Sequence, residues 1–234
     1  MTIQTLTVSL SHPIQRHQIP RWRGAFLEMI GWDEELFHNH ANKGYQGKGT
    51  YASTQTKRSG HHYRYPLIQY YENGAKGMVL GIQEGAIALD KIIHQKELSI
   101  RWNGRQERIE IENIKVGQHR FQMLPQPKTY HLHRWLALTQ KNYTQWLDCA
   151  NLQERIALLD RLLVNHLIGL FKELQWNWPA RLEANLQFLH HTERVRFKGL
   201  ALTAFDVSFT ANVDLPIGIG IGKGVSQGYG TLRK

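Results

Sequence analysis

The feature that most constrains the fold of this chain is the order of strand-like and helix-like patterns in its first half. Residues 3–10 alternate polar and apolar side chains, which is typical of a half-buried strand. Apolar side chains then recur at helical spacing from Pro20 to Ile30, and proline suits the first turn of such a helix. A shorter helical piece is expected after Asp33, which can cap it.

Two hairpins are predicted further along, because an Asn-Gly pair marks the turn of each. Residues 65–71 would pair with 76–82, and residues 99–102 would pair with 106–116. The segment 84–98 between the hairpins is predicted to be a helix. The resulting order of strand, helix, strand, strand, helix and strand is that of a ferredoxin-like fold.

The second half begins after Pro125-Gln126-Pro127, which we take as the domain boundary. Asn151 with Glu154 resembles a capping box and marks the start of a long helix that Pro179 ends. Strands are predicted over residues 129–138, 181–189 and 194–212. A second helix is missing or very short in this half, so we expect a degenerate copy of the first.

The predicted fold class is therefore α+β, with two tandem ferredoxin-like (RRM-like) folds and a glycine-rich loop at the C-terminus. Residues 1–124 would form the first domain and residues 125–234 the second. The halves share the order of their elements and no convincing sequence repeat.

The glycine-rich loop is residues 217–230, which read IGIGIGKGVSQGYG. Glycine lets the backbone approach a ligand closely, so that successive amide groups can face phosphate oxygens. Lys223 adds a positive charge, and Tyr229 can stack on a base. A P-loop is excluded, because Ile217 stands where its first glycine is required and Gly224 follows the lysine. A flexible connection without a ligand is the alternative.

The charge of the chain points to a polyanionic partner. Its 234 residues include 29 Lys and Arg against 19 Asp and Glu, a formal net charge of +10. Such an excess favours nucleic acid through long-range attraction and counterion release. The single cysteine, Cys149, fits a reducing compartment, and no apolar run reaches the roughly 20 residues of a membrane helix. We expect a cytoplasmic protein without an export signal or a membrane partner.

The C-terminal residues carry a specific resemblance to a known family. Gly220 to Gly230 follow the form G-x-G-x-x-x-S-x-G-[FY]-G after a predicted strand. This form resembles the C-terminal loop of the processing endonucleases in the RAMP (repeat-associated mysterious protein) superfamily of CRISPR systems. In those enzymes a leucine-histidine pair often follows the first helix and its histidine is catalytic. Phe37-His38-Asn39-His40 stands at the matching place.

The resemblance implies two tandem ferredoxin-like folds that face each other across a cleft. It implies a metal-independent endoribonuclease that cleaves CRISPR repeat transcripts by 2′-hydroxyl attack. The products would carry a 2′,3′-cyclic phosphate and a 5′-hydroxyl, and no cofactor would take part. The implied partner is CRISPR repeat RNA, with other CRISPR effector subunits as further candidates. Monomer and homodimer both stay open.

The candidate catalytic residues lie at the start of a polar, basic loop, Asn39 to His62. Histidine titrates near neutral pH, so it can take the 2′-hydroxyl proton or protonate the leaving 5′-oxygen. Lysine or tyrosine can stabilise the extra charge on the phosphorane. The predicted catalytic set is His38, His40, Lys43 and Tyr45. Which histidine is the acid, and whether Lys43 or Lys48 assists, stays open.

The expected RNA-binding residues are basic, aromatic or glycine. Arg194, Arg196 and Lys198 alternate along a predicted strand and would share one face. Arg64 stands between two tyrosines and can combine charge with stacking. The predicted RNA-binding set is Lys48, Arg64, Arg194, Arg196, Lys198, Gly220, Gly222, Lys223, Ser226, Gly228 and Tyr229.

Two alternatives are set beside this hypothesis. A zinc site formed by His38, His40 and the His61-His62 pair would supply hydroxide, but these residues lack the ligand spacing of zinc motifs, so we predict no metal. A non-catalytic RAMP-type subunit would hold guide RNA in a CRISPR effector complex, keep the glycine-rich loop and lose the histidines. The presence of His38 and His40 favours the enzyme.

Overall fold

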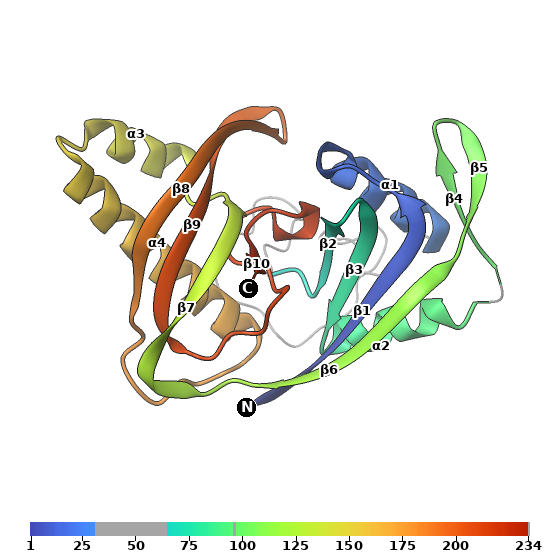
Figure 1. Ribbon diagram of the computed structural model, residues 1–234, viewed down its shortest axis with the longest axis horizontal. Coiled ribbons are helices and arrows are strands. Elements are labelled where there is room, and N and C mark those ends of the chain that lie inside the picture. The colour runs from blue at the N-terminus through green and yellow to red at the C-terminus, as the bar shows by residue number, and fades with distance from the viewer. Residues whose placement is uncertain (31–64, 96, 234) are drawn as a thin grey trace, which may run out of the picture.

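The structure, a computed structural model, describes residues 1–30, 65–95 and 97–233, which form two sheet-bearing halves side by side (Figure 1). The first half contains β1 (Thr2–Pro13), the short 3-10 helix η1 (Arg16–Gln18), α1 (Ile19–Ile30), β2 (Ile68–Asn73), β3 (Lys76–Ile82), α2 (Glu84–Ile93), β4 (Leu98–Trp102), β5 (Arg105–Ile109) and β6 (Ile111–Arg120). The second half contains β7 (Met123–Trp135), α3 (Gln140–Asp148), α4 (Leu152–Glu173), β8 (Ala184–Phe197), β9 (Leu200–Val213), the 3-10 helix η2 (Val225–Gln227) and β10 (Thr231–Arg233).

The first sheet has the strand order β2-β3-β1-β6, and its pairs are all antiparallel. Leu6, Val8 and Leu10 of β1 are buried in one cluster with Trp22 of α1 and Leu89 of α2. The alternation in residues 3–10 therefore has the predicted effect, because one face of β1 packs against the two helices. The opposite face of this sheet carries no helix (Figure 1).

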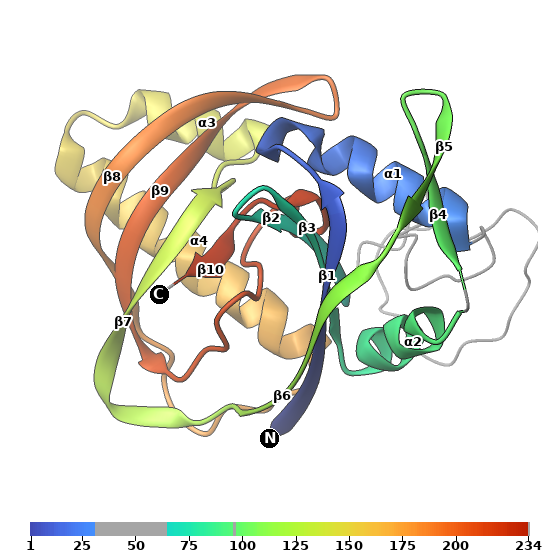
Figure 2. The ribbon, with the colours of Figure 1, turned by 45° about the vertical axis from the view of Figure 1, so that its right-hand side comes forward.

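The second sheet has the order β10-β7-β9-β8, which places its four strands as in the first sheet. Trp135 of β7 and Phe205 and Phe209 of β9 are fully buried in one cluster with the apolar side of α4. Figure 2 shows α3 and α4 on the same side of this sheet. Residues 214–230, all of which the structure describes, contain no α-helix. Two tandem ferredoxin-like folds, with a degenerate second copy, are thus confirmed.

The predicted start of α4 is confirmed by its hydrogen bonds. The Asn151 side chain accepts from the Glu154 backbone N–H at 2.9 Å, and the Glu154 carboxylate accepts from the Ala150 N–H at 2.8 Å. The first contact satisfies a backbone donor that the first helical turn leaves without a partner, and the second fixes the residue before the cap. The helix ends at Glu173, six residues before the proline that was expected to end it.

The elements predicted between residues 84 and 116 need correction. The helix that begins at Glu84 ends at Ile93, so it is shorter than the predicted 84–98. The single strand predicted over 106–116 is two strands: β5 pairs with β4, whereas β6 leaves that hairpin and pairs with β1. The alternating pattern continues through the point where the chain changes sheets, so periodicity alone does not reveal the change.

The second half also departs from prediction. The strands predicted over 181–189 and 194–212 are β8 and β9, joined by the turn Lys198-Gly199, where both residues have positive φ. This turn suits a two-residue hairpin but lacks the Asn-Gly signal. The short strand β10 and the helix α3 were not predicted. Thr139 caps α3 by accepting from the Asn142 N–H at 3.2 Å, yet α3 is polar overall and none of its residues is buried.

Pro125 and Pro127 lie inside β7, which replaces the strand predicted over 129–138. They fall where the pairing of β7 with β9 is interrupted, between Met123 and Lys128. Proline has no N–H to donate to a ladder, so this interruption is where it is tolerated. The domain limit at residue 124 stays a prediction. Among the described helices, none is long and apolar enough to cross a membrane.

Candidate nucleic-acid interface

A cleft of about 820 Å³ lies between the helix-free face of the first sheet and the chain that leads into β10. The first half lines it with the apolar side chains Met78, Leu80 and Ile82 and with polar and basic side chains that include Thr5, Thr7, Ser9, Asn113, Lys115 and His119. Residues 216–219 and 231–233 of the second half close its other side. Hydroxyl, amide and basic groups are the usual ligands of nucleic-acid phosphates and sugars. The cleft is therefore chemically suited to a nucleic-acid strand.

Gly220 ties the glycine-rich segment to the first half. Its N–H donates to the Gln69 side-chain carbonyl at 2.8 Å, and its own carbonyl accepts from the Tyr65 hydroxyl at 2.6 Å. The Gln69 amide group donates to the same hydroxyl at 2.8 Å, which closes a ring of three hydrogen bonds. Burial raises the pKa of Tyr65 well above its usual range, so this hydroxyl remains a donor.

Gly222 is held where only glycine fits. Its φ is +94°, and a Cβ here would lie 2.7 Å from the Trp135 Nε1 and 3.0 Å from the His166 Nδ1. The Trp135 N–H donates to that His166 nitrogen at 3.1 Å, so the imidazole accepts in its neutral form. Burial, with help from Lys223, lowers the pKa of His166 to about 4. Packing against protein atoms thus explains this glycine without any ligand.

The end of the segment packs on the first half as well. A Cβ at Gly228 would lie 2.6 Å from the Ile19 side chain of α1, and Ser226 lies half-buried in η2. These contacts place Gly220 and Gly228 between the two halves, whereas Gly222 packs within the second half. Whether they also contact RNA stays a prediction.

Tyr229 is buried, with 6% of its surface exposed. The Arg134 guanidinium lies 4.6 Å from its ring centre, and the Phe197 ring packs edge-on at 5.6 Å. Base stacking by Tyr229, the role that the sequence suggests, does not fit this packing. Arg134 also ion-pairs with Glu193 and accepts from the Gly230 N–H at 3.1 Å, so it fixes the segment to the second sheet. Arg134 has φ +51° at an irregularity of β7, which no sequence pattern reveals.

The charge of Lys198 acts on Lys223, although the two lysines belong to different predicted elements. Lys198 is exposed in the β8–β9 turn, and Lys223 is half-buried beside Leu136. Partial burial lowers the pKa of Lys223, and the positive charge of Lys198 lowers it further. An anion bound beside Lys223 would relieve this repulsion.

Arg194 and Arg196 of β8 are exposed and share a face, as predicted, while the alternating Val195 and Phe197 are buried. Arg194 donates to the Tyr143 hydroxyl of α3 at 3.1 Å. The two arginines therefore lie on the side of the sheet that bears α3, away from the Tyr229 side.

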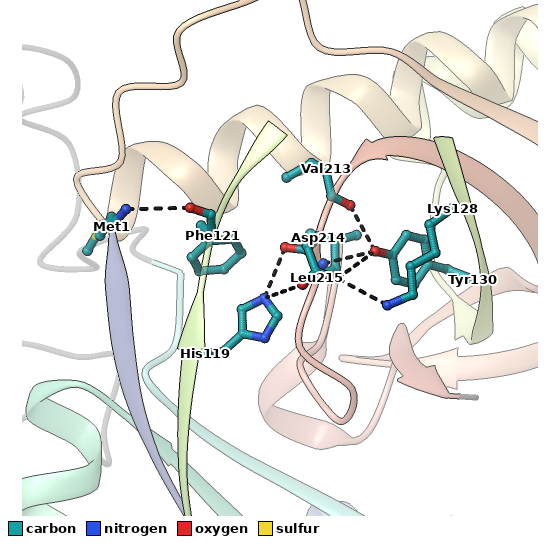
Figure 3. A network of polar contacts seen from close by, with 8 residues as sticks. All are labelled: Met1, His119, Phe121, Lys128, Tyr130, Val213, Asp214 and Leu215. Atoms are coloured by element: carbon teal, nitrogen blue, oxygen red, sulfur yellow. Dashed lines mark hydrogen bonds and ion pairs between the residues drawn. The ribbon is translucent and has the colours of Figure 1, made fainter. Parts of the chain in front are cut away.

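The glycine-rich segment starts from a polar network at the junction of the halves (Figure 3). His119 of β6 contacts the Asp214 carbonyl at 3.0 Å, and Lys128 donates to the Asp214 carboxylate at 3.1 Å. Tyr130 donates to the Val213 carbonyl at 2.8 Å and accepts from the Leu215 N–H at 3.0 Å. Burial raises the pKa of Tyr130 to about 12, so its hydroxyl stays protonated.

The predicted catalytic segment lies outside the described residues. This applies to six members of the predicted sites: His38, His40, Lys43, Tyr45, Lys48 and Arg64. The described chain resumes after that segment at Tyr65, which binds the Gly220 carbonyl. The histidines of the alternative zinc site are not described either. Within residues 1–30, 65–95 and 97–233, no three His, Cys, Asp or Glu side chains are grouped to hold a metal ion.

Comparison with known proteins identifies the family. Residues 1–120 match the Cas6b N-terminal domain, and residues 122–234 match the Cas6b C-terminal domain. A curated relative, an uncharacterised protein of Methanocaldococcus jannaschii, is 30% identical over 98 residues, which are 42% of this chain and 65% of that protein. The aligned part thus spans less than two thirds of the relative's length.

Solved structures share the fold over the whole chain. A structure titled crystal structure of Cas6b is 24% identical with a TM-score of 0.79 and covers 100% of both chains. A structure titled CRISPR RNA processing endoribonuclease Cas6b is 20% identical with a TM-score of 0.69 and covers 99% of this chain and 98% of the other. The resemblance to the CRISPR-associated RAMP processing proteins is confirmed. Because the two domain matches together cover nearly the whole sequence, this chain belongs to the Cas6b family.

Proposed function

We propose that this protein is a metal-independent endoribonuclease that cleaves CRISPR repeat transcripts. The observation that carries the proposal is the match of both halves to the two Cas6b domains. A solved structure with the same fold is titled a CRISPR RNA processing endoribonuclease. The basic chain, and the basic and hydroxyl side chains among those that line the cleft between the halves, support an RNA substrate.

The proposed reaction uses the RNA's own 2′-hydroxyl as the nucleophile. The 2′-oxygen forms a bond to the adjacent phosphorus, and the bond from phosphorus to the 5′-oxygen breaks. The products are a 2′,3′-cyclic phosphate and a 5′-hydroxyl, so neither water nor a cofactor is consumed. One imidazole takes the 2′-hydroxyl proton, and a protonated group delivers one to the leaving oxygen.

His38 and His40 are the proposed acid–base groups, with Lys43 or Tyr45 stabilising the phosphorane charge. The hydrogen bond from the Tyr65 hydroxyl to the Gly220 carbonyl supports a site near the glycine-rich segment, because Tyr65 is the first described residue after the segment that carries both histidines. RNA bound across this junction would contact both halves at once.

The test is incubation of the pure protein with labelled repeat RNA in excess EDTA. A matched RNA carries deoxyribose at the scissile position. Cleavage in EDTA that the deoxyribose blocks supports the proposal. Cleavage only with added metal contradicts the mechanism, and tight binding without cleavage favours a guide-RNA-binding subunit.

The histidines are tested by a double substitution, H38A with H40A. We expect the cleavage rate to fall at least about 100-fold while RNA affinity is kept, because acid–base catalysis contributes roughly that much or more. The control is H17A with H94A, which removes two exposed histidines of the first half. Full activity of the H38A/H40A variant would refute the assignment.

A further inference from the structure

A row of side chains crosses all four strands of the second sheet on the face opposite α4. Phe188 of β8 is paired with Ser208 of β9, Ser208 with His131 of β7, and His131 with Arg233 of β10. Directly paired residues of antiparallel strands share a face of the sheet. These four residues are called the cross-strand row below, and none of them belongs to the segment predicted to be catalytic.

Hydrogen bonds through Ser208 hold two imidazoles of this face in place. Its Oγ lies 2.8 Å from the His131 Nδ1 and also contacts the His190 Nε2. Ser208 is 2% exposed, whereas both histidines are exposed. A hydroxyl can donate to one ring and accept from the other. Each imidazole then keeps its second nitrogen for another partner.

The three rings of this face follow one another across the strands. The centres of Phe188 and His190 are 6.1 Å apart at 33°, and those of His190 and His131 are 6.0 Å apart at 39°. Phe188 is 67% exposed. A single exposed apolar side chain is ordinary on a protein surface. Here the exposed ring lies beside two fixed imidazoles, so an aromatic surface and hydrogen-bonding groups are available together.

Charge on this face favours an anionic ligand. Two guanidinium groups, from Arg16 and Arg233, share the single Glu72 carboxylate at 3.5 and 3.7 Å. Asp206 is engaged by His133 at 3.0 Å. The arginines therefore leave a net positive charge at the β10 end of the row, where Arg233 also lines the cleft between the halves. A strand bound in the cleft can continue onto this face.

We propose that this face of the second sheet binds a single-stranded segment of the RNA, with one base stacked on Phe188 and the backbone phosphates contacted by His131, His190 and Arg233. The inference rests on the proposed function for the identity of the ligand and adds to it a site away from the predicted catalytic segment. Four-stranded sheets with exposed aromatic side chains bind two or three bases in this manner. The positive charge argues against a second copy of this basic chain as the occupant.

The test is binding of a fluorescein-labelled ten-nucleotide oligouridylate with 2′-O-methyl groups, which 2′-hydroxyl attack cannot cleave. Stacking of one base contributes about 1–3 kcal/mol, so F188A of the full chain should bind about 5- to 150-fold more weakly. F188Y keeps the ring and should bind as the wild type does, which separates stacking from misfolding. The matched control is I87A, which removes a 59% exposed side chain of α2.

Photo-crosslinking shows independently where on the chain the RNA binds. The same oligouridylate with one 4-thiouridine should crosslink to the peptide that contains residues 184–197. Unchanged affinity of F188A, or no binding by the wild type, overturns the inference. So does light scattering that shows a dimer dissociated by F188A with unchanged affinity, because the face would then join two copies.

Cleavage separates this inference from the proposed function. If the wild type binds through Phe188 but cleaves no repeat RNA, the proposed activity fails and the binding site stands. If the wild type cleaves and F188A binds normally, the binding site fails and the activity stands.

Discussion

The two halves share one strand order but complete it by different means. In the first half, α2 and the β4–β5 hairpin lead from β3 to the edge strand β6. In the second half, the described residues 214–230 lead from β9 to the edge strand β10 without an α-helix. The comparison teaches that the order of the strands does not require a second helix.

The two connections also differ in what they contact. In the first half α2 packs against β1 and β3 of its own sheet, and Leu89 is fully buried there. The glycine-rich connection instead binds Gln69 and Tyr65 of the other half and packs Gly228 against Ile19. It therefore joins the halves, whereas α2 completes one of them. Changes in this connection should affect the whole molecule.

The largest expected effect is that of G222A. Alanine would be strained at φ +94° and would overlap the Trp135 indole, so we expect unfolding in urea to show a loss of about 3 kcal/mol or more. The control is G199A, at φ +80° in the β8–β9 turn, where a Cβ meets nothing within 4 Å. It should lose only about 1–2 kcal/mol. Equal losses would show that the close approach to Trp135 contributes nothing.

The second effect is a pH dependence that His166 gives to the second half. Its pKa is about 4 in the folded protein and 6.5 unperturbed, so the unfolded chain binds more protons between these values. Stability is fully present above pH 6.5 and falls as the pH drops towards 4. The loss is at most about 3 kcal/mol.

Thermal unfolding between pH 7 and pH 4 measures this effect. H166N keeps an acceptor for the Trp135 N–H and removes the titrating ring. The variant should show a flatter dependence over this range than the wild type. If both respond equally to pH, other groups cause the acid sensitivity.

The sequence predicts the first half better than the second for a physical reason. A strand or helix with one apolar face can be predicted from the regular spacing of its apolar residues. Residues 3–10 and α1 are examples. The change of sheet between β5 and β6 is invisible, because the alternation continues through it. The helix α3 was missed because its sequence is polar overall, which resembles a loop.

The candidate interface was likewise predicted only in part from the sequence. The glycines of 217–230 were found from composition, but their reason for being glycine is packing against Trp135, His166 and Ile19. Tyr229 was expected on the surface and is buried under Arg134. The packing of the glycines and the burial of Tyr229 depend on contacts between segments that are distant in the sequence. Local sequence patterns do not predict such contacts. The cross-strand row is likewise defined by register between strands.

The third effect concerns the hydrogen bonds that join the halves at Gly220. Y65F leaves the Gly220 carbonyl and the Gln69 amide without the hydroxyl that both contact. Leaving buried polar groups unpaired costs about 1–3 kcal/mol, which urea unfolding can measure. The control is Y143F, which removes a hydroxyl that binds the exposed Arg194 and should change stability by roughly 0.5 kcal/mol or less. A Y65F protein as stable as Y143F would mean that the glycine-rich connection is not held by this contact.

The smallest effect separates charge from packing in the connection. K198A and K223A remove the two ammonium groups that lie near each other at the β8–β9 turn and the glycine-rich segment. If both contact phosphates, each substitution should lower the slope of log affinity against log salt by about one and weaken RNA binding several-fold. Fluorescence anisotropy with repeat RNA at several salt concentrations measures both quantities.

The control is K91A, which removes a lysine from α2 of the first half and should leave the slope unchanged. If K223A alters only stability and K198A alters nothing, the glycine-rich connection acts as a structural joint, and its resemblance to an RNA-binding loop reflects packing alone.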